Sequence, residues 1–135
     1  MRQAGRCLCG NIRYEVSGTP KWVAVCHCRD CQRSAGAPMV LWAIFPEAAF
    51  TLKAGTPKAV NSSGSAMRYF CADCGTGLFY RNAVSLPGLV DVQVTTLDDP
   101  SVLPPTVQVQ TAERQAWVVH LAVLPAFERF PSGPA

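Results

Sequence analysis

The sequence predicts a mainly β domain, and three observations carry this prediction. Short segments alternate apolar and polar residues, as in residues 89–95, where Val90, Val92 and Val94 fall on one side. Eleven prolines and ten glycines interrupt the chain at short intervals. No segment of 11 or more residues keeps a helical i, i+3, i+4 stripe free of Pro and Gly. We therefore expect short strands and few short helices.

The elements can be placed in order along the chain. The expected strands are residues 11–16, 40–45, 59–62, 67–70, 77–80, 89–95, 106–109 and 116–121. Residues 28–35 are the best helical candidate, because they follow a cysteine-rich turn without a break by Pro or Gly. The turn at residues 46–49 is the other short helical candidate, and a turn is expected at residues 97–100, since Asp and Pro favour turn geometry.

Composition narrows the class of protein. A chain of 135 residues suits a single domain, here residues 1–135, and can bury a real core. The net charge is only +3 and no run of Lys and Arg occurs, so we expect no nucleic-acid partner. No apolar run approaches the roughly 20 residues of a membrane span, so we expect no membrane partner. Without the apolar core of a secretory signal near Met1, we expect a cytoplasmic protein with reduced thiols.

Seven cysteines carry most of the functional information. They form three groups: Cys7-Leu8-Cys9-Gly10, Cys26-His27-Cys28-Arg29-Asp30-Cys31 and Cys71-Ala72-Asp73-Cys74-Gly75. An odd number of cysteines argues against a complete disulfide framework. Cysteines separated by one or two residues can present both sulfurs to one metal from a tight turn, and zinc accepts four thiolates in a tetrahedron. The pattern therefore favours zinc.

The grouping predicts two zinc ions per chain. The first and third groups resemble each other and together supply four sulfurs, from Cys7, Cys9, Cys71 and Cys74, which is a closed structural site. The middle group supplies three, from Cys26, Cys28 and Cys31. Three protein ligands with one open position are typical of a reactive zinc, so these cysteines are the candidate catalytic group. An open site is usually the weaker one, and we expect it to be partly occupied.

Three other interpretations remain open at this point. Cys7 and Cys9 are ordinary core residues in the first. In the second, the middle group is another structural site, completed by His27, Asp30 or His120. In the third, the middle group is a metal-free redox centre. His27 lies between two expected ligands, so its ring is expected to point away from the metal, and His120 is expected in a strand.

The order and spacing of these motifs identify a resemblance. Cys7-Leu8-Cys9-Gly10 with Ile12-Arg13-Tyr14, the Cys26 to Cys31 group with Ser34-Ala35-Gly36-Ala37-Pro38, and Phe70-Cys71-Ala72-Asp73-Cys74-Gly75-Thr76 are its main landmarks. Leu97-Asp98-Asp99-Pro100, Trp117 and Leu124-Pro125 follow. The chain resembles the family of glutathione-dependent formaldehyde-activating enzymes and centromere protein V, from about Gly5 to Pro131.

The resemblance implies an Mss4-like zinc-binding fold of small antiparallel β-sheets. It implies that Cys7, Cys9, Cys71 and Cys74 hold the structural zinc, and that Cys26, Cys28 and Cys31 hold the catalytic zinc. The founding activity of the family joins formaldehyde to glutathione and gives S-(hydroxymethyl)glutathione. Members often carry a His in the strand after a Pro pair. Here Pro104-Pro105 is followed by Thr106-Val107-Gln108-Val109, without a His.

The chemistry of a three-thiolate zinc points the same way. Three thiolates donate charge strongly, so a bound water is acidified less than on three imidazoles, and a soft thiol suits the open position better. We therefore expect a carbon–sulfur lyase of the S-(hydroxymethyl)glutathione synthase type, with a small thiol, glutathione, and an aldehyde as partners. The alternatives are a non-catalytic module that binds a small thiol and one that binds a protein. A monomer or a homodimer is compatible with the sequence.

Two further sets of residues are candidates for the glutathione site. A ligand with two carboxylates needs cations, and Arg29, Arg33, Arg68 and Arg81 lie near the cysteine groups in the sequence. Solvent-exposed charge is the commoner fate of any single one. Trp22 and Trp42 are candidates for the pocket wall, although core packing is more usual for a Trp near a strand.

Overall fold

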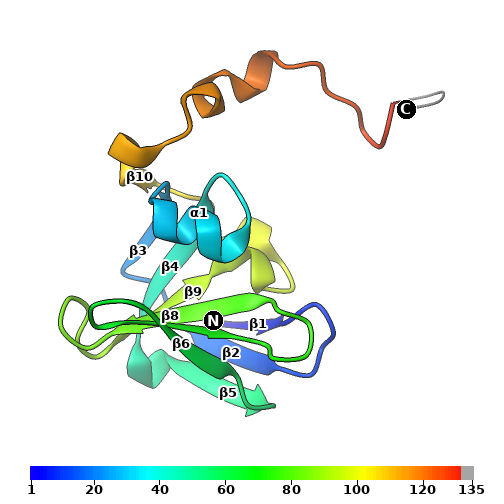
Figure 1. Ribbon diagram of the computed structural model, residues 1–135. Helices are drawn as coiled ribbons and strands as arrows, with labels where there is room; N and C mark the ends of the chain where they lie inside the picture. The colour runs from blue at the N-terminus through cyan, green and yellow to red at the C-terminus, as the bar shows by residue number, and fades with distance from the viewer. Residues whose placement is uncertain (132–135) are drawn as a thin grey trace.

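The computed structural model describes residues 1–131, and the mainly β prediction is confirmed in that range (Figure 1). Two sheets form: one of three strands in the order β1-β2-β5, and one of seven in the order β10-β3-β4-β9-β8-β7-β6. The strands are β1 (Arg2–Arg6), β2 (Arg13–Ser17), β3 (Trp22–Cys26), β4 (Val40–Pro46), β5 (Phe50–Ala54), β6 (Lys58–Ser63), β7 (Ala66–Phe70), β8 (Gly77–Asn82), β9 (Leu89–Gln93) and β10 (Val107–Val109). All strand pairs are antiparallel except β10 with β3.

Helical structure is short. The predicted helix is confirmed as α1 (Arg29–Ala35), which begins after Cys28 and ends at Gly36, whose φ of 62° is the left-handed conformation that glycine tolerates best. Five 3-10 segments complete the set: Glu47–Ala49, Val94–Thr96, Pro100–Val102, Thr111–Glu113 and Ala116–Val123.

Most differences from the predicted elements have a local cause. Strand β1 was not predicted, because it lacks apolar alternation and forms through its pairing with β2. Strands β3 and β5 were also not predicted. The strand expected at residues 116–121 is wrong: Ala116–Val123 is a 3-10 helix and pairs with no strand. The strand expected at 89–95 ends at Gln93, where the 3-10 turn begins. Residues 132–135 of the expected domain lie outside the described residues.

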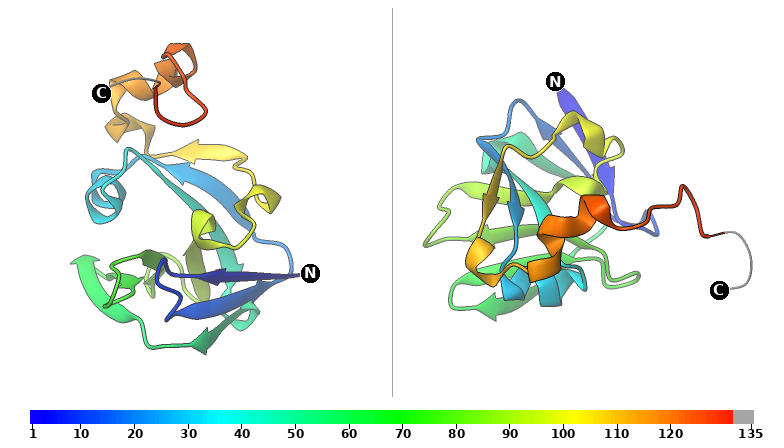
Figure 2. Two further views of the ribbon diagram at one scale, coloured as in Figure 1. Left: turned by 90° about the vertical axis from the view of Figure 1, so that its right-hand side faces the viewer. Right: turned by 90° about the horizontal axis from the view of Figure 1, so that it is seen from above.

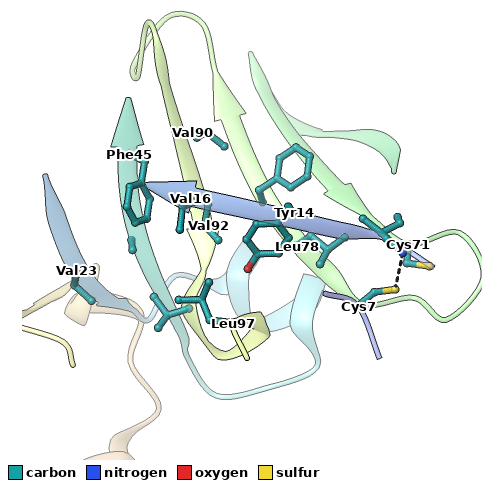
Figure 3. Close-up of a cluster of buried hydrophobic side chains, with 14 residues drawn as sticks. Cys7, Tyr14, Val16, Val23, Phe45, Cys71, Leu78, Val90, Val92 and Leu97 are labelled. Carbon is teal, nitrogen blue, oxygen red and sulfur yellow. Dashed lines mark hydrogen bonds between the residues drawn. The ribbon is translucent and has the colours of Figure 1, made fainter. Parts of the chain in front are cut away.

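The main hydrophobic core lies between the two sheets. Tyr14 and Val16 of β2 face Phe45, Val90 and Leu78 of the larger sheet, and each of these side chains is at most 1% exposed (Figure 3). The burial of apolar side chains in a closely packed core supplies most of the stability of a domain of this kind. Cys7 and Cys71 close one end of the same core, next to Leu78 (Figure 3).

The opposite face of the seven-stranded sheet is not covered by the small sheet. Cross-strand pairing puts Trp22, Ile44, Asp91, Tyr80 and Arg68 in one row across β3, β4, β9, β8 and β7. Side chains in such a row share one face of a sheet. This face therefore forms the floor of a cleft, which Cys28, Asp30 and Cys31 at the start of α1 also line. Helix α1 lies beside β4 (Figure 1).

The C-terminal segment leaves the body of the molecule after β10. Gln110 has a φ of 56° and turns the chain, and residues 116–131 extend away from both sheets (Figures 1 and 2). Several large apolar side chains are exposed there: Trp117, Val119, Leu121, Val123, Leu124, Phe127 and Phe130. Among residues 1–131, none of the helices has the length and apolar character needed to cross a membrane.

Gly5 gives a test of the packing between β1 and β2. A Cβ at Gly5 would lie 2.3 Å from Cζ of the buried Tyr14 ring, so the ring or the strand must move. We expect Gly5→Ala to lower the free energy of unfolding by about 1–3 kcal/mol, as overpacking of a core does. Urea denaturation followed by fluorescence measures the change.

Gly77→Ala is the matched control. The Cβ at Gly77 would meet the mobile end of the Gln93 side chain at 2.5 Å, and that side chain can rotate away. We expect a smaller loss than for Gly5→Ala. Equal losses for the two variants would contradict the close packing of Tyr14 against β1.

Candidate metal centres and the adjoining cleft

Four cysteines from two distant loops meet at one edge of the core. The loop between β1 and β2 carries Cys7 and Cys9, and the loop between β7 and β8 carries Cys71 and Cys74. Their sulfur atoms all lie within 4.8 Å of one another, and all four residues are free of disulfide bonds. We call this group the closed cluster.

The two loops are built alike. In each, the first cysteine donates its N–H to the carbonyl five residues later, from Cys7 to Ile12 at 3.1 Å and from Cys71 to Thr76 at 2.9 Å. Leu8 N–H also donates to Oγ1 of Thr76 at 3.0 Å, which joins one loop to the other. The backbone therefore fixes where both pairs of sulfurs point.

A glycine follows the last cysteine of each pair for a conformational reason. Gly10 and Gly75 have φ values of 81° and 80°, which side chains with a Cβ rarely adopt. The chain can then turn back into β2 and β8 directly after the sulfur. The repeated Cys-Gly of the sequence is thus the signal for two equivalent loops.

The spacing of sulfur atoms in the closed cluster fits a zinc ion. Zinc–sulfur bonds of about 2.3 Å in a tetrahedron place neighbouring sulfurs about 3.8 Å apart. Sγ of Cys9 lies 3.5 Å from that of Cys7 and 3.8 Å from that of Cys71. In addition, Ile12 N–H donates to Sγ of Cys7 at 3.3 Å, a contact that favours the thiolate form.

Three further cysteines form a second group, the open cluster. Cys26 ends β3, Cys28 caps α1, and Cys31 lies in the first turn of that helix. Their sulfurs also lie within 4.8 Å of one another, with 3.7 Å between Cys26 and Cys31. Among residues 1–131, neither a histidine nor a carboxylate joins this group. Both clusters have sulfur donors and spacing that can hold zinc.

The open cluster lies on the wall of a cleft of about 520 Å³. Trp42 and Tyr80 line its floor, with their rings edge to face at 6.1 Å, and Trp22 lies at its margin. Arg68 is 9% exposed and donates from Nη2 to Sγ of Cys31 at 3.7 Å. A small ligand in this cleft can therefore contact sulfur, a cation and aromatic surface together.

The thiols of the open cluster do not titrate alike. Hydrogen bonding with the Cys26 and Cys28 side chains, together with Arg68, lowers the pKa of Cys31 to about 5 despite its burial. The hydrogen bond to Cys31, together with burial, raises the pKa of Cys26 far above its usual value. One thiolate is thus favoured at neutral pH, and binding of a cation by all three sulfurs must release the remaining protons.

A family model supplies the comparison that fits this geometry. The model for glutathione-dependent formaldehyde-activating enzymes matches residues 2–113. The chain belongs to this family. A crystal structure of a Rhodobacter sphaeroides protein is similar, with a TM-score of 0.64, 22% identity, and coverage of 78% of this chain and 99% of that one. At that identity it supports the fold alone, and no curated protein matches the chain.

The family model does not extend over all the motifs on which the resemblance was based. The resemblance was expected to run to Pro131, yet the model ends at residue 113, so Trp117 and Leu124-Pro125 lie in the exposed C-terminal segment. His120 is exposed in the 3-10 helix there and not in a strand, and it does not join the open cluster.

His27 is buried behind the open cluster. Its ring points away from the sulfurs, as expected, and Nε2 donates to Oε1 of Gln108 at 2.9 Å. Gln108 lies in β10, the strand that follows the Pro104-Pro105 pair. The amide of Gln32 also donates to the backbone carbonyl of His27 at 2.6 Å and holds this loop against α1.

Only one of the four candidate arginines reaches the cleft. This residue is Arg68, which is buried, whereas solvent exposure was expected for any single arginine. Arg29 and Arg33 line a separate groove beside α1 that also contains Trp117. Arg81 pairs with Glu47 and packs over the Phe79 ring at 4.9 Å.

Asp91 was not predicted as a site residue. It lies in the cleft, and its Oδ1 is buried without a hydrogen-bond partner. Burial, and then the nearby Cys31, raises the pKa of Asp91 to about 7, while Arg68 opposes that rise. The sequence does contain a signal for this position. Asp91 is the acidic residue on the side of the 89–95 strand opposite Val90 and Val92, so it must lie on the face that the core does not cover.

The raised pKa of Asp91 predicts a pH-dependent stability. An unfolded Asp ionises near pH 4, whereas folded Asp91 keeps its proton to about pH 7, so this group destabilises the fold progressively as pH rises from about 4 to 7. We expect Asp91→Asn to stabilise the protein relative to wild type, by about 2–3 kcal/mol more at pH 8 than at pH 5. Urea denaturation at the two pH values measures this, with the exposed Asp98→Asn as control. The same gain at both pH values would contradict it.

Proposed function

We propose that this protein is a zinc enzyme of the S-(hydroxymethyl)glutathione synthase type, a carbon–sulfur lyase that joins glutathione and formaldehyde. The observation that carries the proposal is the open cluster, with three sulfurs on the wall of a cleft that a small thiol can enter. The membership of the family supports the same substrates.

The closed cluster is the proposed structural site. Cys7, Cys9, Cys71 and Cys74 would supply all four ligands of one zinc and leave no position for a substrate. Cys7 and Cys71 are buried in the main core. The metal would therefore stabilise the contact between the loop that follows β1 and the loop that follows β7. Its role would be to hold the fold and not to take part in chemistry.

The open cluster is the proposed catalytic site. Cys26, Cys28 and Cys31 would hold a second zinc, and a metal there would lower the pKa of a thiol in the open position, so that its sulfur would stay nucleophilic. Arg68 beside Cys31 offsets the negative charge of the sulfurs. Trp42 and Tyr80 provide apolar walls, so a sulfur in the cleft is partly shielded from water.

Metal content distinguishes the two sites. We expect two zinc ions per wild-type chain after reconstitution under reducing conditions. Cys28→Ser should keep one zinc and the fold, whereas Cys74→Ser should lose cooperative unfolding, because structural zinc contributes folding free energy. Elemental analysis and thermal unfolding measure these outcomes. A single zinc in the wild type would rule out the open metal site.

Catalysis is tested against the spontaneous reaction. We expect wild-type protein to accelerate S-(hydroxymethyl)glutathione formation, measured by exchange NMR, and Cys28→Ser to reduce the rate to background. Arg33→Gln is the control, since Arg33 lines the separate groove and should leave the rate unchanged. A wild-type rate equal to background would favour a module that binds the thiol without catalysis.

A further inference from the structure

Two residues that line the cleft each carry one polar atom without a hydrogen-bond partner in the described part of the chain. Nε of Arg68 and Oδ1 of Asp91 are both buried without a hydrogen bond among residues 1–131. They lie in the same cross-strand row, on β7 and β9, with Tyr80 of β8 between them. Arg68 is held in place on both sides, by Sγ of Cys31 at 3.7 Å and by the Tyr80 ring at 5.4 Å.

This arrangement is costly unless a ligand completes it. A buried polar atom without a hydrogen-bond partner destabilises a fold, because it has lost its contact with water and gained nothing in exchange. The two groups could offset that cost by forming an ion pair, yet no ion pair within 4.0 Å joins them in the described part of the chain. Two unpartnered polar atoms on residues that line one cleft therefore indicate a binding site.

The chemistry of the two atoms defines the group that fits. Nε of Arg68 donates only, and Oδ1 of Asp91 accepts when ionised, while the carboxyl donates when protonated. A hydroxyl can accept from Arg68 and donate to Asp91 at the same time. A carbonyl oxygen can accept from Arg68 and from a protonated Asp91. An oxygen atom within hydrogen-bonding distance of both atoms would satisfy both, whichever state the carboxyl is in.

We propose that Arg68 and Asp91 form the oxygen site of the cleft, where the aldehyde oxygen binds and becomes the hydroxyl of the adduct. This proposal rests on the proposed function and assigns Asp91 as a further catalytic residue. Arg68 orients the oxygen and offsets the negative charge that develops on it.

The proton balance of the step is complete without an oxidant or reductant. A lone pair of the thiol-derived sulfur forms the C–S bond, and the π pair of the C=O bond moves to oxygen. That oxygen takes the proton of the Asp91 carboxyl and becomes the hydroxyl. The proton released by the thiol restores the carboxyl. In the reverse direction Asp91 accepts the hydroxyl proton.

The surroundings of Asp91 suit this exchange. The charged or titratable groups that line the cleft with Asp91 are Arg68 on β7, Tyr80 on β8, Asp30 on α1 and the three cysteines Cys26, Cys28 and Cys31. A group that titrates near neutral pH gives and takes protons most effectively there.

Ligand binding tests the contact directly. S-(2-hydroxyethyl)glutathione and S-propylglutathione have nearly the same shape, and only the first has a hydroxyl. We expect wild-type protein to bind the first about tenfold or more tightly, as a hydrogen bond to a charged group implies. Asp91→Asn should reduce this preference several-fold while S-propylglutathione binds as before. Isothermal calorimetry measures both affinities.

The control and the contrary outcomes are distinct. Asp98→Asn should keep the full preference, because Asp98 is exposed and lies outside the cleft. An equal preference in wild type and Asp91→Asn would overturn the oxygen site and leave the proposed function intact. If wild-type protein accelerates adduct formation, Asp91→Asn should slow it at least tenfold and remove a pH dependence near 7. An unchanged pH profile would also overturn the assignment.

Discussion

The structure depends on the burial of one face of the seven-stranded sheet. Side chains alternate between the faces of a strand, so the pairing of β9 that puts Val90 and Val92 into the core also directs Asp91 to the other side. A shift of one residue would exchange these roles. The packing of the hydrophobic core thus determines where the polar side chains of the cleft lie. The stability that the core supplies offsets the cost of burying those polar side chains.

Much of this could be predicted from the sequence, because local patterns carry it. Strands with clear alternation and the helix after Cys28 were found, and both cysteine clusters follow from spacing and the repeated Cys-Gly. Strand β1 was missed because its pairing, and not its composition, makes it a strand. Arg68 and Asp91 are 23 residues apart and meet only through the order of β7, β8 and β9, which no local pattern records.

The two clusters contribute in different ways. The closed cluster lies at the end of the main core and joins loops that hydrogen bonds already hold in place. The open cluster lies beside a smaller apolar group that includes Val40 and Trp42, at the end of the cleft. The proposed structural site and the proposed catalytic site are therefore separated in space. This separation lets the cleft keep buried charges that a core could not tolerate.

The two clusters also differ in the length of chain that must be brought together to form them. Cys9 and Cys71 are separated by 62 residues, so their sulfurs meet only after both hairpins have docked, and the entropy of closing that long segment must be offset first. Cys26 and Cys31 are separated by five residues and can approach each other in a largely unfolded chain. A nascent chain can therefore gather its three local thiols early, whereas the four-thiol cluster forms only once long-range topology is complete.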